Sequence, residues 1–90
     1  MAESKPKLLI VEDSPDLRRG LSDGFAKTGE ADVVAAAASG EEALDLCLAL
    51  PAGPPDAVLM DVRLPGAMNG VEAAVALRRE LPRLPVVFYS

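Results

Sequence analysis

Four side chains that could do chemistry each follow a short apolar run. Glu12 and Asp13 come after LLIV, Asp61 comes after AVLM, and Ser90 comes after VVFY. If the three acidic residues meet, their like charges repel and raise one another's pKa. A hard divalent cation removes this conflict, and Mg²⁺ in proteins binds one or two carboxylates together with waters and phosphate oxygens. An acidic pocket that also presents a hydroxyl group therefore favours Mg²⁺-assisted phosphoryl chemistry, with Asp61 as the nucleophile that forms an aspartyl phosphate.

Each acidic residue taken alone also has an ordinary explanation. Charged residues commonly follow an apolar strand simply because the chain has reached solvent there. An acidic pair at one strand end with a third acid at the end of a neighbouring strand weakens this explanation. The spacing alone does not decide between the two interpretations, so the elements that would position these residues matter.

The apolar runs are typical of strands that are buried on both faces of a parallel sheet. Strands are predicted at residues 8–11, 33–37, 57–60 and 86–89. The second of these contains three alanines, but the eight residues 31–38, between Gly29 and Ser39, are too few for a typical helix.

Capping residues mark three helix starts between the strands. Ser14 precedes a proline, and Ser39 and Asn69 each have a glutamate three residues later, as in a capping box. The helices are predicted to run from Ser14 to Gly29, from Ser39 to about Leu50, and from Asn69 to Pro82. Their buried faces are expected to include Leu17, Leu21 and Phe25 in the first helix and Leu44, Cys47 and Leu48 in the second.

The predicted order is therefore β-α-β-α-β-α-β. This alternation indicates the α/β class, with a doubly wound parallel sheet covered by helices on both faces. In the common doubly wound order the first and third strands are neighbours, which gives the sheet order 2-1-3-4. Their carboxyl ends would bring Glu12, Asp13 and Asp61 into one crevice at the edge where such sheets bind ligands.

Composition excludes several other kinds of function. The chain has 90 residues, 14 acidic and 9 basic side chains, a net charge of −5 and no histidine. Without histidine there is no Ser–His–Asp triad and no usual zinc ligand set. An acidic chain with 3% aromatic residues is a poor candidate for direct nucleic-acid binding. We expect one domain over residues 1–90, with a flexible leader at 1–6.

The single cysteine and the lack of a membrane-length apolar stretch predict a cytoplasmic protein. Cys47 has no partner for a disulfide, which favours a reducing compartment. The N-terminal segment is polar and lacks the features of a targeting peptide, and no apolar stretch approaches the length of a bilayer span. No membrane association is expected.

Three segments together resemble the receiver domains of bacterial response regulators. They are residues 8–15 (LLIVEDSP), 58–66 (VLMDVRLPG) and 69–74 (NGVEAA). The resemblance extends from about Lys7 to Ser90 and implies a flavodoxin-like receiver fold. It also implies phosphorylation by a sensor histidine kinase or a phosphotransfer protein, with Mg²⁺ as the cofactor.

The resemblance assigns a role to each candidate site residue. Asp61 matches the phosphorylated aspartate, and Asp13 and Glu12 match the acidic pair that binds Mg²⁺, Asp13 directly and Glu12 through water. The backbone carbonyl of Arg63 matches the remaining protein ligand of the metal. Ser90 matches the Ser/Thr whose hydroxyl contacts the phosphoryl group. Tyr89, the residue before it, is expected to be buried beside Ser90 with its hydroxyl hydrogen-bonded.

Two departures from the receiver pattern stand out. The loop at residues 64–70 (LPGAMNG) is one residue longer than usual, which would alter phosphoryl access or lifetime. Receiver domains also continue past the position of Ser90 with a helix, a fifth strand carrying a lysine, and a last helix. We expect this sequence to be about three quarters of a domain from a longer protein; a shortened chain and a natural minimal domain are the alternatives. The fourth strand would then be a sheet edge that favours pairing with a second copy, as in a homodimer.

Three functions remain open from the sequence. The leading one is a phosphoacceptor receiver that switches an effector or dimer surface, which is a signalling role and not an enzyme activity. The second is a receiver-like interaction module that is not phosphorylated. The third is a small Mg²⁺-dependent phosphatase, which is weaker because such hydrolases need an acid two residues after the nucleophile, where this chain has Arg63.

Overall fold

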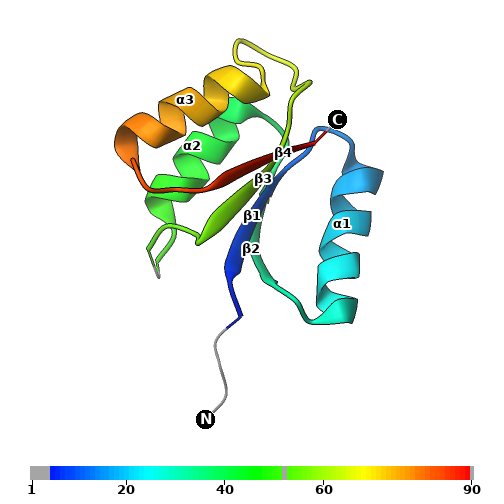
Figure 1. The fold of residues 1–90 in the computed structure, drawn as a ribbon. Helices are drawn as coiled ribbons and strands as arrows, with labels where there is room; N and C mark the ends of the chain where they lie inside the picture. The colour runs from blue at the N-terminus through cyan, green and yellow to red at the C-terminus, as the bar shows by residue number, and fades with distance from the viewer. Residues whose placement is uncertain (1–4, 52, 90) are drawn as a thin grey trace.

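The computed structural model describes residues 5–51 and 53–89, and within them strands and helices alternate as predicted (Figure 1). The strands are β1 (Lys7–Val11), β2 (Asp32–Ala37), β3 (Ala57–Asp61) and β4 (Val86–Tyr89). The helices are α1 (Pro15–Thr28), α2 (Gly40–Ala49) and α3 (Gly70–Glu80). The second helix ends one residue before the predicted Leu50, whose backbone is extended.

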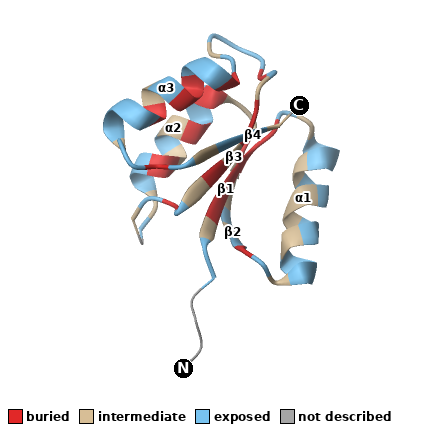
Figure 2. Ribbon diagram, in the orientation of Figure 1, coloured by how far each residue is buried: buried red, intermediate tan, exposed pale blue. Residues whose placement is uncertain are grey.

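The strands described form one parallel sheet in the order β2-β1-β3-β4, which confirms the predicted order. Helix α1 covers one face of this sheet, and α2 and α3 lie side by side on the other (Figure 1). The doubly wound α/β architecture is therefore confirmed. Burial is greatest along β1 and β3, the two central strands (Figure 2).

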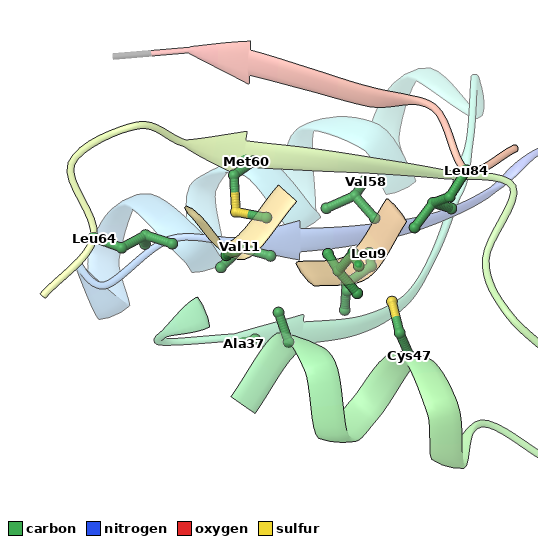
Figure 3. Close-up of a cluster of buried hydrophobic side chains, with 11 residues drawn as sticks. Leu9, Val11, Ala37, Cys47, Val58, Met60, Leu64 and Leu84 are labelled. Atoms are coloured by element: carbon green, nitrogen blue, oxygen red, sulfur yellow. The ribbon is translucent and has the colours of Figure 1, made fainter. Parts of the chain in front are cut away.

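Alternation along the central strands divides the buried residues into two clusters. Leu9 and Val11 of β1 pack with Val58 and Met60 of β3 against α2 and α3. Figure 3 shows Leu9 and Cys47 meeting between β1 and α2. The alternate residues of the strands face α1 in a smaller cluster, because successive side chains of a strand point to opposite faces.

Cys47 belongs to the larger cluster and has a structural place in the core. Its side chain is 2% exposed, and burial raises the pKa of its thiol. A protonated thiol in an apolar environment is a poor nucleophile. The residue therefore packs as a small hydrophobic side chain.

Two expectations about buried helix faces are wrong. Leu17 is 59% exposed, because the small cluster under α1 reaches only Leu21 and Phe25 of that helix. Leu48 is 58% exposed, because Ala43 and Cys47 face the sheet and the next residue is rotated by about 100° around the helix. None of the helices in residues 5–51 and 53–89 is both long and apolar enough to cross a membrane.

Candidate functional site

The three predicted acidic residues meet at the carboxyl edge of the sheet. Glu12 and Asp13 follow β1, and Asp61 is the last residue of β3, the neighbouring strand. One carboxylate oxygen from each residue lies within 4.8 Å of the others. Oxygen ligands at this spacing fit a hard cation such as Mg²⁺. The prediction that these three carboxylates come together at the strand ends is confirmed.

Glu12 is the most deeply buried member of this cluster and is held at both carboxylate oxygens. Its side chain is 2% exposed. Oε1 accepts a hydrogen bond of 2.6 Å from the hydroxyl of Tyr89, and Oε2 accepts one of 2.9 Å from the backbone amide of Ser14. The amide of Ser14 lies just before α1, so the start of that helix and the end of β4 together orient this carboxylate.

Asp61 is held by the turn that follows it. Its Oδ1 accepts a hydrogen bond of 3.0 Å from the backbone amide of Arg63, two residues later. The backbone amide of Val62, between these two residues, donates a hydrogen bond to the carbonyl of Tyr89 on β4. The turn therefore places the backbone of Arg63 beside the acidic cluster, while Asp61 itself is only 9% exposed.

The loop between β3 and α3 is held at both ends by hydrogen bonds at the start of α3. The amide of Gly70 donates to the carbonyl of Val62 at 3.0 Å. Asn69 and Glu72 form a complete capping box, in which each side chain accepts from the backbone amide of the other residue. This predicted cap fixes the first turn of α3, and the hydrogen bond from Gly70 to Val62 joins that turn to the residue after β3.

The electrostatics of the cluster favour an ionised Glu12. Burial raises the pKa of Glu12, but hydrogen bonds from the Tyr89 hydroxyl and the Ser14 amide outweigh burial, and the net shift is downward. In the part of the chain that the structure describes, no lysine or arginine side chain donates a hydrogen bond to the three carboxylates. Arg18 is nearby, but its Nη1 donates to the backbone carbonyl of Glu12. The cluster can therefore accept a cation.

Ser90, the remaining predicted site residue, lies outside the described residues. The residue before it has a contact that the sequence did not reveal. The predicted hydrogen bond of the Tyr89 hydroxyl is confirmed, with a partner, Glu12, that is 77 residues away. The predicted burial is wrong, because Tyr89 ends the edge strand β4 and stays partly exposed. The signal available in the sequence was the position of Tyr89 at a strand end; the partner depended on how β4 lies in the sheet.

Comparison with known proteins gives a consistent result. The family model of the response regulator receiver domain matches residues 8–90. A protein-glutamate methylesterase/protein-glutamine glutaminase of Geobacillus kaustophilus is 38% identical over 84 residues, and the transcriptional regulatory protein LnrK of Bacillus subtilis is 37% identical over 84 residues. Each alignment covers 93% of this chain.

The solved structures show the same likeness in three dimensions. The crystal structure of a LuxR-family two-component response regulator from Aurantimonas sp. SI85-9A1 matches with a TM-score of 0.83 and 30% identity over 94% of this chain. The chain spans 58% of that structure, and 23% and 36% of the two curated relatives. The similarity thus concerns one region of longer proteins.

Proposed function

Because the chain belongs to the response regulator receiver domain family, we propose that it accepts a phosphoryl group on Asp61 from a histidine kinase or a phosphotransfer protein. The family is a signalling domain of two-component systems and interacts with such phosphoryl donors. The observation that carries the proposal is the meeting of Glu12, Asp13 and Asp61 within 4.8 Å at the carboxyl edge of the sheet.

The proposed chemistry is a displacement at phosphorus. The Arg63 amide holds Oδ1 of Asp61, which leaves Oδ2 as the nucleophile. A bond forms between Oδ2 and phosphorus, the bond between phosphorus and the donor's imidazole nitrogen breaks, and its electron pair leaves with the imidazole. The position of Asp61 at a fixed strand end favours this attack, because a positioned nucleophile avoids part of the entropic cost of the reaction.

The acidic cluster suits the Mg²⁺ that receiver domains bind. Asp13 and Asp61 would hold the ion directly, Glu12 through a water molecule, and the backbone carbonyl of Arg63 would complete the protein ligands. When bound, Mg²⁺ supplies charge neutralisation for the phosphoryl oxygens. Glu12 accepts two hydrogen bonds, which lower its pKa and favour the ionised carboxylate that would attract the ion.

The output of the reaction would be a change of charge at the strand edge. Phosphorylation of Asp61 would add negative charge close to the start of α3. The two lie close together because the turn after β3 is hydrogen-bonded to Gly70, the first residue of α3. We expect this charge to shift a two-state surface that an effector or a second copy recognises. This role is signalling, and the chain's own chemistry is limited to accepting the phosphoryl group and losing it to water.

The test is the intact mass of the protein after incubation with acetyl phosphate and Mg²⁺. The wild type is expected to gain one phosphoryl group, and Asp61→Asn none. The matched control is Asp45→Asn, which changes an exposed acid on α2 and is expected to label like the wild type. A fourth arm, in which a chelator removes the Mg²⁺, is expected to abolish labelling.

Two results would reject the proposal. Labelling of Asp61→Asn would show that another residue accepts the phosphoryl group. No labelling of the wild type, with Mg²⁺ present, would instead favour the second interpretation, an interaction module that works without phosphorylation.

A further inference from the structure

Tyr89 connects β4 with the residue after β1 at the carboxyl edge of the sheet, where the acidic cluster lies. Its hydroxyl lies 2.6 Å from Oε1 of Glu12, although β3 separates β4 from β1 in the sheet. The side chain therefore crosses the carboxyl end of β3, over two strand spacings of about 4.8 Å each. Tyr89 is paired with Asp61 in the strand register, so it crosses at the level of the phosphoacceptor.

Strand alternation explains why these two side chains meet. Val87 lines a hollow on the α1 side of the sheet with Leu8 and Leu59, and Tyr89, two residues later, projects from the same face. Glu12 likewise comes two residues after Ile10, which packs in the cluster under α1, so the two side chains leave the same face. Tyr89 and Glu12 therefore leave the same face of the sheet at its carboxyl edge.

The contact fixes the orientation of the Glu12 carboxylate. With Oε2 bonded to the Ser14 amide and Oε1 to the Tyr89 hydroxyl, the group cannot rotate without breaking a hydrogen bond. Each carboxylate oxygen has a second acceptor site, which stays available for a water molecule or a cation. Among the described residues, no buried side-chain polar atom lacks a hydrogen-bond partner, so neither buried oxygen of this contact is left unpaired.

We propose that Tyr89 is a positioning residue that sets the Mg²⁺ affinity of the acidic cluster by holding the carboxylate of Glu12. The inference rests on the proposed function, since it concerns the same cation site. Side chains that orient the ligands of a metal, without touching the metal, change metal affinity by about 10–100-fold when they are removed. Tyr89 would have this relation to Glu12, which would itself hold the ion through a water molecule, so we expect an effect at the lower end of that range.

The first test compares Mg²⁺ binding to the wild type and to Tyr89→Phe by isothermal titration calorimetry. The substitution keeps the ring and removes only the hydroxyl. We expect the Kd for Mg²⁺ to rise at least about 10-fold. The matched control is Phe88→Leu, one residue earlier on the opposite face of β4, which is expected to keep the wild-type Kd. An unchanged or lower Kd in Tyr89→Phe overturns the inference.

A double-mutant cycle separates positioning from a general structural effect. If Tyr89 acts through Glu12, then Tyr89→Phe has no further effect on the Mg²⁺ Kd in a Glu12→Gln background. The same about 10-fold effect in that background would show that the hydroxyl acts by another route, and would overturn the inference.

Tyrosine fluorescence reports on the contact directly, even if a variant is less stable. The chain contains one tyrosine and no tryptophan, so its tyrosine emission comes from Tyr89 alone. A carboxylate that accepts a hydrogen bond from the phenolic hydroxyl quenches this emission. We expect Glu12→Gln to emit more strongly than the wild type in the folded state; equal emission would show that the contact does not form in solution and would overturn the inference.

The two proposals fail in different ways. A wild type that binds Mg²⁺ but gains no phosphoryl group rejects the proposed function and leaves the role of Tyr89 intact. Equal Mg²⁺ Kd values for the wild type and Tyr89→Phe, with normal labelling of Asp61, reject only the role of Tyr89. A wild type that binds no Mg²⁺ rejects both.

Discussion

Gly70, the first residue of α3, lies so close to Asp61 that a β-carbon on residue 70 would overlap the carbonyl oxygen of Asp61. The same β-carbon would lie 2.8 Å from Cα of Val62. Both neighbours are backbone atoms, which cannot move aside as a flexible side chain can. The turn from β3 to α3 therefore leaves no room for a side chain at residue 70.

Gly70→Ala is expected to lower the free energy of unfolding by about 1–3 kcal/mol, as overpacking of a well-packed site does. Because the clash is with the backbone of Asp61, we also expect less phosphoryl incorporation per folded molecule. Denaturant unfolding followed by circular dichroism measures the first effect, and intact mass after acetyl phosphate treatment measures the second.

Gly20→Ala is the matched control for this change. Gly20 lies in the middle of α1 on its exposed side, and a β-carbon there would meet no atom within 4 Å. Alanine in place of glycine within a helix stabilises by about 0.5–1 kcal/mol. Equal effects of the two substitutions would contradict the close approach at Gly70.

Leu77→Ala is expected to destabilise the chain by about 2–5 kcal/mol, because it leaves a cavity in the larger cluster. Leu77 is fully buried on α3, whereas Val75 on the same helix is 49% exposed. Val75→Ala should therefore change the free energy of unfolding by no more than about 0.5 kcal/mol. Chemical denaturation of both variants tests the burial pattern, and similar losses would contradict the placement of α3 on the sheet.

Asn69→Ala is expected to cost about 1 kcal/mol of stability, because it removes the side-chain acceptor that caps α3. Asn69→Asp retains an oxygen that accepts from the Glu72 amide, and should lose less. Thermal unfolding of the two variants is the measurement. A larger loss for the aspartate variant would show that the cap does not depend on this acceptor.

The stability of the chain is expected to fall in acid through Glu12. Its pKa in the folded chain lies below the ordinary value of 4.5, so protonation favours the unfolded state. The stabilisation is present above that ordinary value and is lost as the pH falls through the folded pKa. Denaturant midpoints between about pH 7 and pH 3, measured without divalent cations, should show this decline.

Glu12→Gln should weaken the same pH dependence, because the titrating group is gone. Glu80→Gln is the matched control, since it removes an exposed carboxyl group at the end of α3. A decline in Glu12→Gln as steep as that of the wild type would assign the acid sensitivity to other groups.

Local patterns were sufficient to predict the order of elements and the meeting of the three carboxylates. Apolar runs bounded by capping residues predicted the strands and helices, and the capping box at Asn69 and Glu72 formed as expected. Once the strands are parallel and β1 lies beside β3, Glu12 and Asp61 must share an edge, because Glu12 directly follows β1 and Asp61 ends β3. The confirmed part of the site follows from strand direction alone.

The sequence by itself determined the α/β class, because residue periodicity and capping residues define the alternating strands and helices. Together with the common doubly wound order, it also predicted the sheet order and the acidic edge, since the position at which each strand ends is visible in the sequence. Only the tertiary structure decided that Leu17 and Leu48 are exposed and that Tyr89 reaches Glu12 across β3. These features depend on how far each helix extends over the sheet and on the register between strands distant in sequence. Such distances are set by packing of the whole chain, so no local pattern contains them.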